Sequence, residues 1–239
     1  MVNDFMKVGL MQPYLFPYLG YFQLINAVNV FILYDDVQYI KNGWINRNKI
    51  LVKNREGMFT FSVKKDLSTK LINQRYYSDN AFETTKDNFL KTLYLSYKKA
   101  PYFSETHEVL SEIFNYNTLN VAEFNSNSLK ILCDYMNINT KILISSSLKK
   151  NNELKSQHRV IEINRVLGSD CYINPIGGIE LYSPNVFNEN GIQLKFIRMN
   201  EIKYPQFEGK FIPSLSIIDV LMFNSKEEIK YLLSNYKLI

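Results

Sequence analysis

The sequence contains few of the residues that build disulfide, metal-binding or membrane-spanning structures. Its two cysteines, Cys133 and Cys171, have neither CxxC nor Cys/His spacing, which argues against a disulfide framework and a structural zinc. No apolar stretch approaches the roughly 18 residues of a membrane helix. The start, MVNDFMKVGL, also lacks the long apolar segment of a signal peptide. We therefore expect a cytoplasmic protein with no membrane span and no metal site.

The chain is well supplied with apolar, aromatic and basic residues. Its 239 residues are 46% hydrophobic, and 28 Lys and Arg against 23 Asp and Glu give a formal net charge of +5. The basic residues are scattered, so anionic small ligands are expected as readily as nucleic acid, and tRNA stays an open partner. The 17 tyrosines and 16 phenylalanines either stack on a base or a sugar or serve core packing alone.

Residues 8–39 are the stretch around which the chain is organised. A short apolar run breaks at Gln12, helical periodicity follows, and a second apolar run ends in Asp35-Asp36. This pattern predicts a βαβ unit. Ligands of open α/β sheets lie off the carboxyl ends of the strands, so the pattern places a binding site beside these polar residues.

The next segment combines basic, amide and aromatic side chains. Residues 41–48 hold the single tryptophan, Trp44, together with Lys41 and Arg47. The two cations could clamp a phosphate, with arginine offering its bidentate fork, while Trp44 lies against a ring. The alternative is a solvated loop in which Trp44 fills the core. A β-hairpin that turns near residues 54–57 should follow.

The remaining pattern predicts the fold class. Residues 66–140 carry helical apolar stripes, and α/β alternation returns from residue 141. We expect an α/β protein with a mostly parallel, Rossmann-like sheet of about five strands, similar to that of nucleotidyltransferases, with a hairpin and an inserted helical layer. Residues 1–65 and 141–239 would form the nucleotide-binding-like domain, and residues 66–140 the helical insertion.

Polar loops follow the later strands as well. They contain Ser147, Asn174 and the pair Gly177-Gly178, which permits close backbone approach to an anion at a helix start, although a tight turn also explains it. Farther on, Asp219 falls on an apolar helix face. A buried carboxylate needs a basic or amide partner, and a structural ion pair is favoured over catalysis there.

Four stretches carry a family resemblance: the long motif MQPYLFPYLGYFQLINAVNVFILYDDVQYIKNGWINRNKI, then YINPIGGIELY, YPQF and FIPSLSIID. With these motifs, the sequence resembles the WbqC-like protein family over essentially its whole length. Members are found among bacterial O-antigen and other surface-polysaccharide genes, so the resemblance implies a tailoring step on a nucleotide sugar. It implies transfer of an acyl or aminoacyl (glycyl) group to the amine of a nucleotide-linked amino sugar.

A second resemblance concerns the first strand–helix junction. Nucleotidyltransferases and class I tRNA synthetases carry an HxGH motif there, and this chain reads Tyr18-Leu19-Gly20-Tyr21. The glycine fits, but both imidazoles are replaced by phenols, which donate a hydrogen bond but carry no positive charge. An ATP-dependent nucleotidyltransferase or ligase is therefore the alternative enzyme, and a non-catalytic partner in a glycan pathway is the other alternative.

Transfer of an acyl group to a sugar amine needs a base near that amine, and the sequence offers three candidates. Asp35 and Asp36 follow the second strand, where one could accept a proton or hold magnesium while the other binds sugar hydroxyls. His158 lies near a predicted site loop, but it begins a helix, and the alternative is that its imidazole only caps or packs there. His107, in the helical layer, is expected to be a surface or satisfied residue.

The candidate binding residues are the polar, aromatic and glycine positions of the predicted loops and of the family motifs. No cofactor is identified; ATP with magnesium or an activated acyl donor is the expected co-substrate. The candidate binding residues are Gln12, Tyr14, Tyr18, Gly20, Tyr21, Gln38, Lys41, Trp44, Asn46, Arg47, Ser147, Asn174, Gly177, Gly178, Tyr204 and Gln206.

Overall fold

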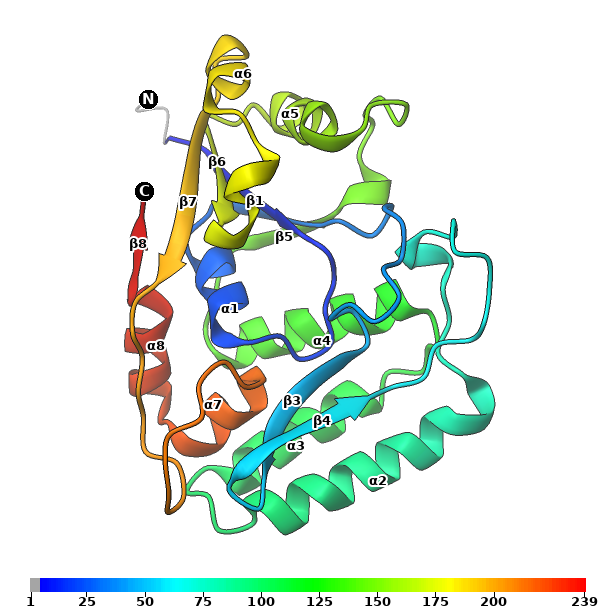
Figure 1. Ribbon diagram of the computed structural model, residues 1–239, viewed down its shortest axis with the longest axis vertical. Helices are drawn as coiled ribbons and strands as arrows, with labels where there is room; N and C mark the ends of the chain where they lie inside the picture. The colour runs from blue at the N-terminus through cyan, green and yellow to red at the C-terminus, as the bar shows by residue number, and fades with distance from the viewer. Residues whose placement is uncertain (1–4) are drawn as a thin grey trace.

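A six-stranded sheet occupies the upper half of the molecule in Figure 1, with the order β5-β2-β1-β6-β7-β8. The structure is a computed structural model and describes residues 5–239. The first five strands in this order pair in parallel, and β8 pairs antiparallel with β7 at the edge. The strands are β1 (Lys7–Met11), β2 (Val30–Leu33), β5 (Lys141–Ile144), β6 (Cys171–Pro175), β7 (Gln193–Met199) and β8 (Tyr236–Leu238).

Both faces of the sheet are buried, which explains why its inner strands read as continuous apolar runs. Alternate residues of β2 face opposite ways: Phe31 joins the larger core, whereas Val30 and Ile32 join the smaller one. The larger core includes residues of α1 (Leu19–Asn26), α4 (Val121–Tyr135), α7 (Ile217–Phe223) and α8 (Lys226–Ser234). The smaller core includes residues of α5 (Ser156–Leu167) and α6 (Pro184–Glu189).

The lower half of the molecule is built from the hairpin and two further helices, α2 (Asp79–Tyr97) and α3 (Phe103–Phe114). Strands β3 (Arg47–Val52) and β4 (Arg55–Thr60) are joined by two residues, Lys53 and Asn54, that both have positive φ. This is the backbone that a tight hairpin requires. Three short 3-10 segments complete the chain: η1 (Ile72–Gln74), η2 (Ser145–Ser147) and η3 (Ile176–Leu181).

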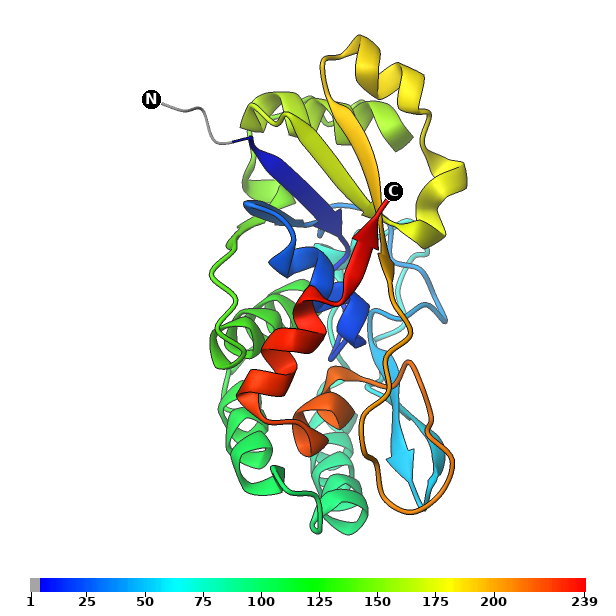
Figure 2. The same ribbon diagram turned by 90° about the vertical axis from the view of Figure 1, so that its left-hand side faces the viewer.

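The structure confirms the expected α/β class, the mostly parallel sheet and the hairpin. The tail contains two helices, α7 and α8, followed by a strand. Ser225 restarts the helix as α8 through a capping box with Glu228, and β8 then lies beside β7, as Figure 2 shows. Between β6 and β7 the chain forms η3 and then α6, which begins at Pro184.

The expected helical insertion at 66–140 contains α2, α3 and α4. Their apolar residues belong to the same large core as the helices that cover the sheet. The division into two domains stays a prediction. Within residues 5–239, no helix has the length and apolar character needed to cross a membrane.

Candidate functional site

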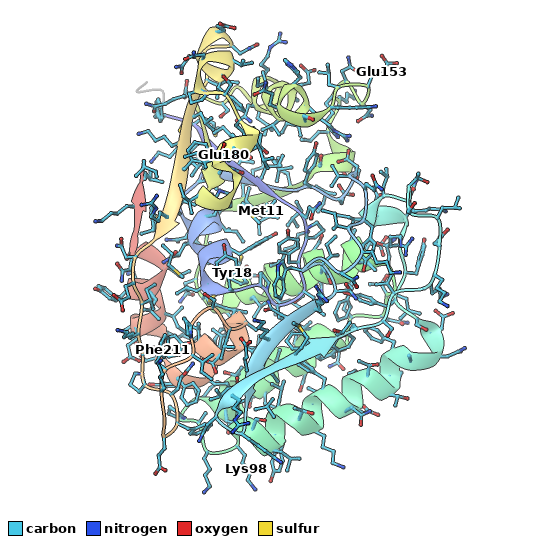
Figure 3. All side chains as sticks on the ribbon, in the orientation of Figure 1. Met11, Tyr18, Lys98, Glu153, Glu180 and Phe211 are labelled. Atoms are coloured by element: carbon cyan, nitrogen blue, oxygen red, sulfur yellow. The ribbon has the colours of Figure 1, made fainter. Side chains whose placement is uncertain are left out.

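Three segments that are distant in sequence meet beyond the carboxyl end of β1. The Leu15 backbone N–H donates to the Ile45 carbonyl at 3.0 Å. The Asn48 amide and the Ser216 hydroxyl both donate to the Phe16 carbonyl, each at 2.7 Å. These bonds fix the turn after β1 against the start of the hairpin and the first turn of α7, and Figure 3 places Tyr18 in this middle region of the molecule.

An aromatic pocket of about 250 Å³ lies where these segments meet. Trp44 is 43% exposed and lines this pocket, so it does not fill the core. Burial raises the pKa of Tyr14 and of Tyr18, which keeps both phenols neutral near neutral pH. Neutral rings of this kind can stack on a base or a sugar. The aromatic pocket is lined by Tyr14, Pro17, Tyr18, Trp44, Asn48 and Ser214.

A basic groove of about 980 Å³ adjoins the aromatic pocket. The two share the loop before β3, where the Arg47 guanidinium lies 5.6 Å from the centre of the Trp44 ring. Arg47 also donates to the carbonyls of Gly43 and Asn42, which holds its fork in place. The charged side chains of the basic groove are Lys41, Arg47, Lys64, Lys65, Asp66 and Arg75, so its walls carry an excess of positive charge.

Two predicted amide residues shape the walls of the basic groove. Gln38 donates to the Ser68 carbonyl at 2.8 Å. Asn46 accepts from the Tyr39 hydroxyl at 2.8 Å and donates to the Phe61 carbonyl at 2.7 Å. Because the Asn46 amide makes both of these protein contacts, its role here is to hold the groove's shape.

Asp35 lines a separate, polar pocket of about 320 Å³ that shares no lining residue with the basic groove. One carboxylate oxygen accepts from the Ser146 N–H at 2.9 Å, and the other accepts from the Ser146 hydroxyl at 2.6 Å and the Asn73 amide at 3.0 Å. Lys130 lines the same pocket. The carboxylate therefore ties β2 to η2 and η1 at the edge of a cavity.

Asp36 is occupied by ion pairs. Its carboxylate lies 2.7 Å from the Lys150 ammonium and 2.6 Å from the Arg159 guanidinium, and all three side chains are largely buried. Burial acts to raise the pKa of Asp36, but the hydrogen bond from Lys150 and the charge of Arg159 outweigh it and lower the pKa. A carboxylate held anionic in this way is a weak general base.

His158 and Ser147 stand apart from both the aromatic pocket and the basic groove. His158 is exposed on α5, and it is the next residue, Arg159, that pairs with Asp36. Ser147 is exposed in η2, and its neighbour Ser146 makes the contacts to Asp35. Neither side chain lines the pockets described above.

Asn174 and the glycine pair form a packed turn after β6. Asn174 accepts from the Tyr172 hydroxyl at 2.9 Å and donates to the Pro175 carbonyl. A Cβ on Gly178 would collide with the Asn174 amide, whereas a Cβ on Gly177 would meet no atom within 4 Å. The Gly178 position thus serves tight packing, and only Gly177 leaves space above the backbone.

The Tyr18-Leu19-Gly20-Tyr21 segment begins α1, as the comparison with nucleotidyltransferases requires. Tyr21, however, is fully buried and donates its hydroxyl to the Gln12 carbonyl at 2.8 Å. A Cβ on Gly20 would collide with the Tyr18 ring. Of the four residues only Tyr18 lines the aromatic pocket, so the segment does not present two donors to a triphosphate.

Tyr204 and Gln206 contact a buried acid. The Tyr204 hydroxyl and the Gln206 amide each donate to Asp219 at 2.7 Å, and Tyr97 donates to its other oxygen at 2.8 Å. Asp219 therefore has the expected amide partner, but it forms no ion pair within residues 5–239. Tyr204 also lines a small apolar cavity with Tyr18.

The sequence did not single out two residues of the basic groove, Tyr39 and Arg75. Both line the groove, and the Arg75 guanidinium lies 4.8 Å from the centre of the Tyr39 ring. The available signal was a lone arginine, in INQRYYS, with amide residues before it, aromatic residues after it and no acidic neighbour. As for metals, residues 5–239 contain no group of three or more His, Cys, Asp or Glu side chains placed to hold an ion.

Comparison with known proteins assigns a family. Residues 12–231 match the family model described as the WbqC-like protein family. A protein of Mycobacterium tuberculosis, "Uncharacterized protein Rv1507c", is 27% identical over 229 residues, which are 95% of this chain and 97% of the relative. No solved structure matches the chain. Because the family match extends from the turn after β1 to α8, this chain belongs to the WbqC-like protein family.

Proposed function

We propose that this chain is a cytoplasmic transferase of bacterial surface-polysaccharide biosynthesis, including O-antigen, and that it moves an acyl or aminoacyl group onto the amine of a nucleotide-linked amino sugar. The observation that carries the proposal is the adjacency of the aromatic pocket and the basic groove, joined by Trp44 and Arg47. A nucleotide sugar has the matching parts, because its rings stack on aromatic faces and its diphosphate is neutralised by cations.

The size and charge of the two cavities support a small ligand. Their volumes, about 980 and 250 Å³, are those of small-molecule sites. The groove gathers its five cations around one hollow, whereas sequence-independent binding of nucleic acid uses a long basic surface. An aminoacyl-tRNA therefore enters the proposal only as one possible donor of the acyl group, alongside a thioester and an acyl-adenylate.

The reaction is a direct acyl transfer. The sugar amine attacks the carbonyl carbon of the activated donor, the N–C bond forms, the bond from carbon to the leaving group breaks, and one amine proton passes to a base. We assign that base to Asp35 at the carboxyl end of β2, with the amino sugar reaching from the basic groove into the polar pocket that Asp35 lines. Asp36 is paired with two cations, and His158 lies exposed on α5, so they are poorer candidates.

The test is a transfer assay with purified protein, nucleotide-linked amino sugars and a panel of acyl and aminoacyl donors, read by the mass of the sugar nucleotide. Asp35→Asn should lower kcat by about 10²- to 10⁴-fold, the usual contribution of a positioned base. Because Asp35 does not line the aromatic pocket or the basic groove, KM should change little. The matched control is Glu153→Gln, an exposed acid far from both cavities (Figure 3).

Three results would count against the proposal. Magnesium-dependent pyrophosphate release from ATP, with no transfer to any sugar, would favour the nucleotidyltransferase or ligase alternative. Binding of a sugar nucleotide without turnover of any donor would favour the non-catalytic partner. Equal losses in Asp35→Asn and Glu153→Gln would remove the role given to Asp35.

A further inference from the structure

The basic groove contains a buried arginine whose charge no carboxylate balances. Arg75 is only 7% exposed, yet its side chain lines the groove. Within residues 5–239, Arg75 forms no ion pair with a carboxylate. Burying an unpaired charge costs several kcal/mol. A site built in this way is incomplete without an anion.

The donors of Arg75 are only partly used. One terminal nitrogen donates to the Leu67 carbonyl at 3.1 Å, and the other donates to the Lys64 carbonyl at 3.0 Å. The Nε–H is buried and has no partner. A guanidinium carries five N–H groups in a rigid fork, so the protein positions the fork and leaves part of its hydrogen-bonding capacity open.

Tyr39, which lies against Arg75, is not its counter-ion. The guanidinium lies 4.8 Å from the ring centre, a cation–π contact that offsets part of the cost of burial. Burial raises the pKa of the Tyr39 hydroxyl, although the nearby charges of Arg75 and Arg47 act to lower it. The phenol therefore stays neutral at neutral pH, and its hydroxyl donates a hydrogen bond to Asn46.

The rim of the basic groove has the same unbalanced charge. Among the groove cations, Lys64 is paired with Asp79 at 2.7 Å. The single groove acid, Asp66, lies 3.8 Å from Lys70 and, within residues 5–239, forms no ion pair with a cation of the groove itself. The cations of the basic groove that form no ion pair within the described chain are Lys41, Arg47, Lys65 and Arg75.

We infer that the basic groove is a diphosphate-binding subsite, with Arg75 as its floor and Lys41, Lys65 and Arg47 around its rim. The inference deepens the proposed function and rests on it for the identity of the ligand that carries the diphosphate. The number of unpaired cations suits two linked phosphates better than a single monoester. The fork of Arg75 matches phosphate oxygens in the geometry that arginine commonly uses.

Titration calorimetry with inorganic pyrophosphate tests the subsite without any transfer chemistry. The wild-type chain should bind pyrophosphate and UDP, but bind uridine, which lacks phosphate, much more weakly. Lys41→Ala/Lys65→Ala should weaken pyrophosphate binding about tenfold, since two charge-assisted contacts are lost. Lys99→Ala is the matched control, because Lys99 is also exposed but lies at the end of α2, beside the labelled Lys98 in Figure 3.

Arg75→Lys tests the floor of the groove. It keeps the positive charge but removes the fork, so it should weaken pyrophosphate binding about tenfold or more. Arg75 also holds two backbone carbonyls, so the variant's thermal unfolding must be measured alongside. If Arg75→Lys does not fold, the lysine double variant alone decides the question.

The outcomes separate the subsite from the proposed function. Pyrophosphate binding that depends on Lys41 and Lys65, without any acyl transfer, leaves the subsite standing and removes the function. Acyl transfer that persists unchanged in Lys41→Ala/Lys65→Ala leaves the function standing and removes the subsite. Equal weakening by Lys99→Ala, or tighter binding of an RNA oligonucleotide than of UDP, would also overturn the subsite.

Discussion

Asp219 shows how one buried carboxylate organises three parts of the chain. Its first oxygen accepts from Tyr97 on α2, and its second accepts from Tyr204 and Gln206 in the loop after β7. Tyr97 in turn accepts from the Leu51 N–H of β3 at 2.6 Å. Burial raises the pKa of Asp219, although these three donors act to lower it. The acid therefore serves as a structural acceptor.

Asp219→Ala should reduce the free energy of unfolding by about 3–5 kcal/mol. The substitution leaves two phenols and an amide without their acceptor, and each unsatisfied buried donor costs about 1–3 kcal/mol. Urea denaturation checks the prediction. Asp87→Ala, at an exposed position of α2, is the control and should change stability by less than about 0.5 kcal/mol. A loss below about 1 kcal/mol for Asp219→Ala would contradict this role.

Asp36 gives a prediction for the dependence of stability on pH. Its pKa is lowered in the folded chain, so its ion pairs stabilise the fold above the ordinary carboxyl pKa of about 3.9, and this contribution is lost as the pH falls through the lowered value. Asp36→Asn should therefore flatten the acid limb of the curve of unfolding free energy against pH. At pH 7 it should cost about 3–5 kcal/mol, because it leaves Lys150 buried with no carboxylate.

Glu208→Gln, at an exposed position, is the control for Asp36→Asn. It should leave both the plateau and the acid limb nearly unchanged, because exposed charges contribute little to stability. An acid limb that is the same in Asp36→Asn and the wild-type chain would show that other carboxylates govern acid unfolding.

At the scale of elements, α8 depends on its capping box. The Ser225 hydroxyl accepts from the Glu228 N–H at 3.2 Å, and the Glu228 carboxylate accepts from the Ser225 N–H at 2.6 Å. Ser225→Ala should lower the free energy of unfolding by about 1 kcal/mol. Ser104→Ala, in the first turn of α3, is the control, because Tyr102 is the N-cap there and makes no side-chain cap bond. Equal effects of the two changes would contradict the capping role.

The elements differ in how well the sequence predicts them, and the reason is periodicity. The strands 30–33 and 171–175 are buried on both faces, so their apolar runs stand out. The edge strand Tyr236–Leu238 has three residues, one half-buried and two exposed, which is too short and too polar to leave a pattern. Its pairing with β7 is a tertiary event that the local sequence does not record.

The candidate site divides in the same way. Trp44, Lys41 and Arg47 were visible because a lone tryptophan between cations is unusual in sequence. Arg75 was not, because its defining property is the absence of a carboxylate around its folded position. The pairing of Asp36 with Lys150 and Arg159 was hidden for the converse reason, since the partners lie more than a hundred residues away. Long-range charge balance cannot be read from spacing along the chain.

At the scale of the whole molecule, ligand binding should be coupled to global stability. The basic groove is formed by the segment after β2, the two ends of the hairpin and the region around η1, all of which pack on the large core. A nucleotide-linked amino sugar at about a hundred times its dissociation constant should add about 2.7 kcal/mol to the free energy of unfolding. For a chain of this length, the melting temperature should rise by roughly 5–10 °C.

Electrostatic attraction should supply much of the stabilisation by the bound nucleotide sugar, because the ligand-free groove holds cations without ion-pair partners. The rise in melting temperature should shrink as sodium chloride is increased at fixed ligand, since salt screens the rim lysines. Lys41→Ala/Lys65→Ala, with its affinity lowered about tenfold, should lose about half of the rise, while Lys99→Ala should keep it. Differential scanning fluorimetry across a salt series gives both measurements. An equal rise with sodium chloride alone, matched in ionic strength to the ligand, would mean that the groove responds to ionic strength and not to a seated nucleotide.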